Sequence, residues 1–243
     1  MSDLSFHPTV LRLRQLKKSF VDLPPSLALR LNRKKREQLV TEFRQLTSVE
    51  ACIDFTKRHM EIGSCQIPNE ISPAIDLIAE TKPKVMCEIG TLDCGTSLLF
   101  SRFLPTLDML ICMDLYVKNK PMLRLLSKSS LHLEFVEASS YSKSAVDATE
   151  RLLNGKLIDV LLIDGDHRYE GVSQDFECYR PLVRDGGLIL FHDIVQEKGD
   201  GHAWAGGVPQ FWKEVRQKFP YREIINDPNQ SGFGIGMITN SSI

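Results

Sequence analysis

The amino-acid sequence predicts an α/β fold in which a mostly parallel sheet carries helices on both faces and ends in an antiparallel hairpin. From residue 71 onward, short apolar segments alternate with segments of helical periodicity, which is the pattern of a parallel sheet covered by helices. A glycine turn joins the first of these strands to the helix that follows it. The last two segments, 221–225 and 232–238, have the character of a closing antiparallel pair.

The predicted strands and helices follow one another in turn. Strands are expected at 85–89, 109–114, 131–136, 158–163 and 187–192, before the closing pair. Helices are expected at 71–79, 96–104, 120–127, 142–153, 170–180 and 209–219. The chain of 243 residues is expected to form one main domain, residues 63–243, and a helical appendage, residues 1–62. The appendage could serve as a lid, a substrate wall or an oligomer contact, and its apolar character favours a homodimer or a larger assembly.

The composition excludes several classes of protein. Ten basic and three acidic residues between Leu11 and Arg44 give this segment a net charge of +7, which leaves −8 for the rest of the chain. Such a segment is more often a solvated helix face than a binding patch, and without interleaved aromatic residues no nucleic-acid partner is expected. Six scattered cysteines without a C-x-x-C pair are expected to be reduced. No apolar run reaches membrane length and no signal pattern is present, so a cytoplasmic location is expected.

The segment from Lys84 to Phe100 is the one around which the rest of the chain is organised. It has the pattern of a buried strand, a glycine turn and the start of a helix. Gly90 and Gly95 allow backbone conformations and close approaches that a side chain would block. Thr96 and Ser97 are expected to cap the helix. A crevice lined by backbone N–H groups is therefore expected at the carboxyl end of the strand.

Glu88 helps to choose among the ligands that this turn could bind. A dinucleotide site requires G-x-G-x-x-G to cradle a pyrophosphate, but here an acid precedes the glycine and no third glycine is in register. A carboxylate near the turn would repel phosphates and attract an ammonium group or sugar hydroxyls. Asp114 ends the second strand 26 residues later, where an acid can hold both hydroxyls of an adenosine ribose. A plain strand–turn–helix without a ligand remains the third alternative.

The run E-x-G-T-x-x-x-G-T-S, from Glu88 to Ser97, resembles motif I of the class I S-adenosylmethionine-dependent methyltransferases. The order of elements from about residue 66 to residue 239 is similar to the Rossmann-like, seven-stranded sheet of that family. The resemblance implies S-adenosylmethionine as the cofactor. Together with the strand ends, it implies cofactor contacts from Gln66, Glu88, Gly90, Thr91, Gly95, Thr96, Ser97, Asp114, Ala138, Ser139 and Asp164.

Ionisable side chains gather at the expected ends of the fourth and fifth strands. Asp164, Asp166 and His167 follow the fourth strand, and His192 and Asp193 follow the fifth. Because these strands are expected to be neighbours, the side chains should converge beside the cofactor. His167 can accept a proton near neutral pH. Two carboxylates and an imidazole suit one divalent ion; the oxygen ligands favour Mg or Mn, and the histidine favours Mn or Fe.

The pair of motifs I-D-G-D-H-x-Y-E-G-V and F-H-D-I resembles a methyltransferase group that includes macrolide sugar O-methyltransferases and cephalosporin hydroxylase-like proteins. This resemblance implies that Asp164 and Asp193 are metal ligands and that His167 is the general base. The third ligand position is usually acidic in that group and falls on His192 here. A metal-free site, in which Asp164 contacts the substrate or the cofactor, therefore stays open.

The expected function is O-methylation of a hydroxyl on a small molecule, a sugar or a natural product, with His167 and Asp164 as the catalytic candidates. The alternatives are a cofactor-binding scaffold protein without methyl transfer and an NAD-linked reductase. The loop 195–207 carries four glycines, His202 and Trp204. It is expected to be either a mobile lid that completes the site on closure or a surface loop whose tryptophan packs back on the domain.

Overall fold

The computed structural model describes residues 33–60, 62–199 and 204–241. The chain divides into two compact units, residues 1–46 and 47–243. The described part of the first unit is helix α3 (Arg33–Gln45). Residues 1–32 of the expected helical appendage, which include much of the basic segment, lie outside the described residues. Helix α4 (Val49–His59) belongs to the second unit, so the boundary between the units precedes this helix, whereas the sequence analysis placed it after residue 62.

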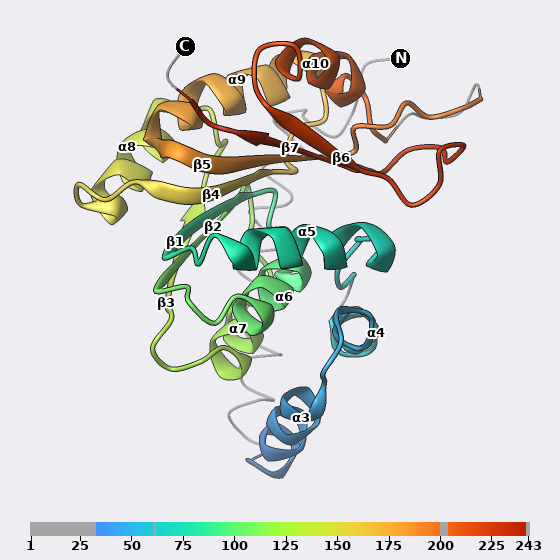
Figure 1. Ribbon diagram of the computed structural model, residues 1–243. Helices are drawn as coiled ribbons and strands as arrows, with labels where there is room; N and C mark the ends of the chain where they lie inside the picture. Colours follow the sequence, from blue (N-terminus) through green and yellow to red (C-terminus); the bar gives the residue numbers. More distant parts are fainter. Residues whose placement is uncertain (1–32, 61, 200–203, 242–243) are drawn as a thin grey trace, which may run out of the picture. The chain divides into compact units, whose positions relative to one another are not determined.

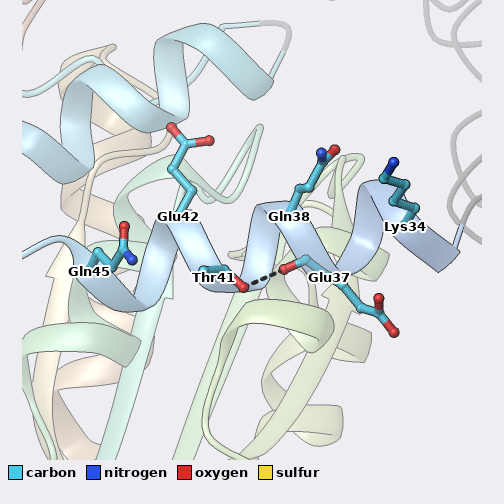
Figure 2. A pocket seen from close by; sticks show the side chains of 6 residues that line it. All are labelled: Lys34, Glu37, Gln38, Thr41, Glu42 and Gln45. Atoms are coloured by element: carbon cyan, nitrogen blue, oxygen red, sulfur yellow. Dashed lines mark hydrogen bonds between the residues drawn. The ribbon is translucent and has the colours of Figure 1, made fainter.

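Helix α3 presents a polar face to solvent. A shallow hollow along it is lined by Lys34, Glu37, Gln38, Thr41, Glu42 and Gln45 (Figure 2). The Thr41 hydroxyl donates a hydrogen bond of 2.8 Å to the Glu37 carbonyl of the same helix. The Glu37 carboxylate pairs with Arg33 one turn earlier. The hollow thus combines charges of both signs on largely exposed side chains, which is typical of a solvated helix face.

The second unit is built on one sheet of seven strands in the order β3-β2-β1-β4-β5-β7-β6. Its strands are β1 (Val85–Ile89), β2 (Met109–Asp114), β3 (His132–Glu137), β4 (Ile158–Ile163), β5 (Val183–His192), β6 (Tyr221–Ile224) and β7 (Ile235–Thr239). The first five strands are parallel, and β7 lies antiparallel between β5 and β6. The predicted fold class is confirmed. Every residue of the central strand β1 is buried, as expected for a strand covered on both faces.

Helices cover both faces of the sheet (Figure 1). One face carries α5 (Pro68–Glu80), α6 (Gly95–Phe103) and α7 (Lys120–Leu126), with α4 packed on α5 and α6. The other face carries α8 (Lys143–Leu153), α9 (Tyr169–Tyr179) and α10 (Val208–Val215), and the short 3-10 helix η2 (Arg180–Leu182) leads from α9 into β5. None of the helices in the described part of the chain is long and apolar enough to cross a membrane.

Strand β5 begins at Val183, earlier than the expected start at residue 187. The strand runs through Gly186 and Gly187, and its pairing with β4 shifts register between Ile158 and Val160. Gly186 has a φ of +69°, and a Cβ on Gly187 would lie 2.7 Å from a side-chain carbon of Val183. The glycines therefore mark an irregularity within the strand and not its boundary.

Glu70 on α5 holds the long loop between β6 and β7. Its side chain is wholly buried. Its carboxylate accepts hydrogen bonds from the Asn226 amide nitrogen at 3.1 Å, the Gln230 side chain at 2.7 Å and the Gly234 amide nitrogen at 2.9 Å. A loop 156 to 164 residues away along the chain is thereby fixed at the start of α5. This contact sets the position of the loop beside the carboxyl end of β5.

Candidate active site

Two glycines let the loop after β1 approach its neighbours closely. Gly90 has a φ of +92°, and a Cβ there would lie 1.8 Å from the carbonyl oxygen of Asp164. A Cβ on Gly95 would lie 2.3 Å from the amide nitrogen of Ser64. Only glycine fits at either position. These contacts align the carboxyl ends of β1 and β4 and hold residues 63–64 against the start of α6.

Glu88, next to the last residue of β1, is a buried acid with 1% of its surface exposed. Alternate residues of β1 pack toward α8, α9 and α10, so Glu88 faces the α6 side of the sheet. Its carboxylate accepts hydrogen bonds from the hydroxyls of Ser97 and Thr91. Burial raises the pKa of Glu88 to about 7, although the Ser97 hydrogen bond acts in the opposite direction.

The start of α6 differs from the expected cap. The helix follows Cys94, which has a φ of +61° and makes no side-chain capping hydrogen bond. The Ser97 hydroxyl is bonded to Glu88, and the Thr96 hydroxyl shares a hydrogen bond of 3.2 Å with Ser64. The expectation that Thr96 and Ser97 cap the helix is therefore wrong. Their hydroxyls instead fasten α6 to β1 and to the loop before α5.

Two carboxylates fix the backbone around the 91–94 turn. Asp114 accepts a hydrogen bond of 2.9 Å from the amide nitrogen of Leu92. Asp93 is 1% exposed and accepts from the amide nitrogens of Ile62 and Gly63 at 2.7 and 2.9 Å. The sequence analysis selected Asp114 but missed Asp93. These two partners of Asp93 lie about 30 residues earlier in the chain, a third, Asn119, lies 26 residues later, and no local pattern indicates any of them.

Asp164, His167, His192 and Asp193 meet at the carboxyl ends of β4 and β5, and we call them the acid–histidine cluster. His192 Nδ1 lies 3.2 Å from Asp164 Oδ1 and 3.4 Å from Asp193 Oδ2. His167 Nε2 lies 3.5 Å from Asp164 Oδ1, and its Nδ1 lies 3.5 Å from Asp193 Oδ2. Asp193 has a φ of +62°, which is uncommon for a residue other than glycine. Such backbone strain is found at functional sites, where the surrounding structure enforces it.

The cluster favours positive charge. Burial alone would raise the pKa of Asp164, but His192 and His167 outweigh burial and hold it well below its usual range. Burial would lower the pKa of His167, but its contacts with Asp164 and Asp193 raise it to about 9. The same two carboxylates raise the pKa of the buried His192 well above its usual value. A cation, whether a proton or a metal ion, is therefore stabilised between the carboxylates.

Asp164, His167 and Asp193 each offer a ligand atom, and these three atoms lie within 4.8 Å of one another. The histidine of this group is His167, whereas the sequence analysis assigned the third ligand to His192. His192 is more deeply buried, with 4% of its surface exposed, and its Nε2 has no hydrogen-bond partner in the described part of the chain. The two carboxylates are common to both ligand sets, which differ only in the histidine.

Gln66 is bonded to Asp164, whereas Asp166 has other partners. The Gln66 side chain donates a hydrogen bond of 3.3 Å to Asp164 Oδ2, which brings the segment before α5 to the cluster. Asp166 turns away and pairs with Arg168. Of the acids that follow β4, only Asp164 therefore contributes to the cluster.

Ala138 and Ser139 form the turn after β3. The amide nitrogen of Ala138 donates a hydrogen bond of 3.1 Å to the carbonyl of Asp114 at the end of β2. Both residues are partly exposed at the same edge of the sheet as the acid–histidine cluster. The turn thus continues the line of strand ends that begins with Glu88 and Asp114.

Trp204 belongs to the site through its backbone. Its carbonyl oxygen lies 2.5 Å from His167 Nδ1, and its side chain is 79% exposed. The tryptophan is therefore not packed back on the domain. The sequence analysis noted its indole but missed the carbonyl, because any residue type supplies that group. His202 of the same loop lies outside the described residues.

Comparison with known sequences identifies the segment that carries this site. A methyltransferase-domain family model matches residues 87–194, from β1 to the residue after Asp193. An uncharacterised protein of Acanthamoeba polyphaga mimivirus is 39% identical over 62 residues, which make up 26% of this chain and 27% of the viral protein. The match thus spans about a quarter of the length of that relative.

Two solved structures share the fold. The O-methyltransferase TomG of Streptomyces achromogenes, involved in tomaymycin synthesis and solved in complex with S-adenosylmethionine, has a TM-score of 0.56 and 14% identity, over 87% of this chain and 100% of that one. An rRNA methylase of Streptococcus thermophilus has a TM-score of 0.50 and 9% identity, over 73% of this chain and 100% of that one. At these identities the likeness concerns the fold alone. Residues 87–194 therefore match a methyltransferase domain, and the sheet has the Rossmann-like methyltransferase fold.

Proposed function

We propose that this protein transfers the methyl group of S-adenosylmethionine to a hydroxyl oxygen of a small-molecule acceptor, with His167 as the proton acceptor. The observation that carries the proposal is the acid–histidine cluster, where His167 lies within 3.5 Å of both Asp164 and Asp193. An imidazole held by carboxylates at the edge of the cofactor cradle is suited to deprotonating an acceptor. O-methylation needs this step, because a neutral hydroxyl is a weak nucleophile.

The tautomer of His167 supports this role. The Trp204 carbonyl can only accept a hydrogen bond, so the Nδ1 that lies 2.5 Å away carries hydrogen. Because the pKa of His167 is raised to about 9, the ring is protonated near neutral pH and acts as a base only after it loses that proton. In the neutral imidazole that results, the other nitrogen, Nε2, has a free lone pair. The carbonyl thus orients the ring and leaves Nε2 to take the proton of the acceptor. Asp164, 3.5 Å from Nε2, stabilises the imidazolium that forms.

The cofactor cradle is our name for the end of β1, the turn that follows it and the ends of β2 and β3, and its residues fit S-adenosylmethionine. The cofactor carries a positive charge and no phosphate; the end of β1 supplies the acid Glu88, and the turn after it supplies two glycines that leave room for close approach. Each oxygen of the Asp114 carboxylate can accept more than one hydrogen bond, so its contact with Leu92 does not prevent it from holding a ribose hydroxyl. Gln66, Thr91, Ser97, Ala138, Ser139 and Asp164 complete the proposed cofactor contacts.

The acid–histidine cluster also fits a divalent cation such as Mg or Mn. Two carboxylates and an imidazole are donors that such ions accept, and the raised pKa of His167, about 9, shows how strongly the carboxylates favour positive charge. A bound ion would supply Lewis acidity, which lowers the pKa of an acceptor hydroxyl. We assign Asp164, Asp193 and His192 to the ion, which leaves His167 as the base. The alternative set replaces His192 by His167.

The test uses the full chain with S-adenosylmethionine and a panel of phenols, methyl glycosides and aliphatic alcohols, in the presence of Mg, Mn or a chelator. The readout is S-adenosylhomocysteine. We expect His167→Ala to lower turnover by about 10²- to 10⁴-fold, the usual contribution of a general base, with cofactor affinity within about twofold of wild type. Asp193→Asn should abolish turnover, and adding Mg or Mn should not restore it. Asp108→Asn, an exposed carboxylate at the amino end of β2, is the matched control and should change neither.

The outcomes separate the candidate functions. Cofactor binding without S-adenosylhomocysteine from any acceptor and metal would favour a scaffold protein. Binding of NAD in place of S-adenosylmethionine would favour a reductase. Unchanged turnover in His167→Ala would remove the base assignment. Paramagnetic resonance of bound Mn distinguishes the ligand sets, because His192→Asn should abolish the bound signal under our assignment and His167→Asn under the alternative.

A further inference from the structure

Two exposed aromatic side chains flank the acid–histidine cluster. Trp204 follows β5 and is 79% exposed, and Phe233, in the loop before β7, is 40% exposed. The carbonyl of Trp204 contacts His167, and the ring of Phe233 lies edge-on to His192 with 6.1 Å between the ring centroids. Each histidine of the cluster thus has one exposed aromatic residue beside it.

The backbone of Trp204 is held firmly, although its indole lies in solvent. The amide nitrogen of Gly207 donates a hydrogen bond of 2.7 Å to the carbonyl of His167. A Cβ on Gly206 would lie 2.3 Å from the same carbonyl oxygen. The intervening Ala205 is wholly buried. An indole projecting from a fixed backbone forgoes the hydrophobic stabilisation that packing would give it, so folding of the domain does not explain its exposure.

The backbone of Phe233 is also fixed, in a conformation that bulky residues disfavour. Its φ is +58°, a conformation that is a genuine outlier for a bulky residue. Its carbonyl accepts a hydrogen bond of 2.9 Å from the amide nitrogen of Val195, and the next amide, that of Gly234, is bonded to the buried Glu70. The strain is therefore enforced from both sides of the residue. Its result is an aromatic ring that stands half exposed beside His192.

We infer that Trp204 and Phe233 form the acceptor subsite, and that the acceptor carries its hydroxyl on a ring whose apolar face packs on Trp204. Because the Trp204 carbonyl lies 2.5 Å from His167 Nδ1, a ring packed on the Trp204 side chain would lie near this imidazole, and a hydroxyl on the edge of that ring would be directed toward Nε2. Aromatic residues stack on flat rings and on the apolar faces of sugar rings, whereas a linear alcohol gains little from them. This inference rests on the proposed function for its chemistry, but the subsite can be tested by binding alone.

The binding test uses the fluorescence of the full-length protein. The chain has two tryptophans, and because Trp212 is 1% exposed, quenching by a bound ring reports on Trp204. Catechol and methyl β-glucoside serve as ring probes, and 1-butanol as the linear probe. We expect saturable quenching by at least one ring probe and none by butanol. The ring probe that quenches distinguishes a phenolic acceptor from a sugar. Absence of saturable quenching by both ring probes would overturn the inference.

The kinetic test separates the subsite from the catalytic cluster. With an acceptor that is turned over, Trp204→Ala should raise the KM for a ring acceptor at least about tenfold, leave kcat and cofactor affinity within about twofold, and be rescued by Trp204→Phe. Leu157→Ala, which removes an apolar side chain 50% exposed at the amino end of β4, should leave KM unchanged. Turnover with an unchanged KM in Trp204→Ala would refute the subsite and leave the proposed function standing. Ring binding without turnover would support the subsite and count against the proposed function.

Discussion

Asp175 offers a quantitative test of the electrostatics in this domain. The residue lies on α9 with no exposed surface, and neither carboxylate oxygen makes a hydrogen bond of good geometry within the described residues. Burial raises its pKa from 3.8 to about 7, against a smaller opposing effect of the Ser140 side chain. Because a tenfold change in proton affinity corresponds to about 1.4 kcal/mol, the buried charge costs the folded state up to about 4 kcal/mol.

The sign of the pH dependence follows from this raised pKa. Between about pH 4 and pH 7 the folded protein binds a proton at Asp175 that the unfolded chain has lost, so this residue makes stability fall as pH rises through that window. Asp175→Asn removes the titrating group and keeps the shape of the side chain. We expect the free energy of unfolding of Asp175→Asn, relative to wild type, to grow by about 2–3 kcal/mol from pH 5 to pH 8.

Urea unfolding at several pH values measures this difference directly. Taking the difference between variant and wild type cancels the contribution of other titrating groups, including Glu88. Asp147→Asn on α8 is the control, because Asp147 lies on the surface in a pair with Lys143 and should show no such trend. A stability difference between Asp175→Asn and wild type that stays constant across this pH range would refute the reasoning. It would mean that the carboxylate finds hydrogen bonds, for example from Ser140, that compensate its burial.

Three further substitutions test the packing around the site. Glu70→Gln should lower the free energy of unfolding by about 2–4 kcal/mol in urea, because an amide cannot accept hydrogen bonds from all the donors that surround this buried carboxylate. Leu92→Gly should raise the melting temperature slightly, by the equivalent of about 0.5–1 kcal/mol, because Leu92 is exposed and has a φ of +44° that glycine adopts without strain. Gly90→Ala should abolish cofactor binding in calorimetry, since its Cβ would overlap the carbonyl of Asp164. Gly155→Ala, with a similar φ but no atom within 4 Å of the added Cβ, should leave binding intact, and equal losses in both would contradict the steric argument.

The fold was predictable because its signals are local. Strands β1, β2 and β4 have the expected bounds. Each is a short apolar run between turn residues, a pattern that depends only on residues adjacent in sequence. The exceptions have tertiary causes. The start of β5 depends on the backbone conformation at Gly186. Thr96 and Ser97 do not cap α6, because their hydroxyls are hydrogen-bonded to Ser64 and Glu88 instead.

The residues that gather at the candidate site could be predicted from the sequence, but their arrangement could not. Strand ends indicated that Asp164, His167, His192 and Asp193 lie at one edge of the sheet. Which histidine joins the carboxylates as a ligand depends on the positive φ of Asp193 and on a backbone carbonyl of Trp204, and neither has a signature in residue type. Asp93 and Asp175 were missed for a related reason, because their importance comes from burial and from partners remote in sequence.

The order of the strands has a consequence for how the protein folds. Strands β1, β2 and β3 pair with the strands next to them in sequence, so this half of the sheet can form as soon as its chain is available. The pairing of β1 with β4, which sets Met86 opposite Val160, closes a loop that contains two complete strand–helix units. The cofactor cradle is therefore expected to gain structure before the catalytic half docks against it. Asp164 and Asp193 follow β4 and β5, which are also consecutive in sequence, so their mutual repulsion arises within the catalytic half before it docks.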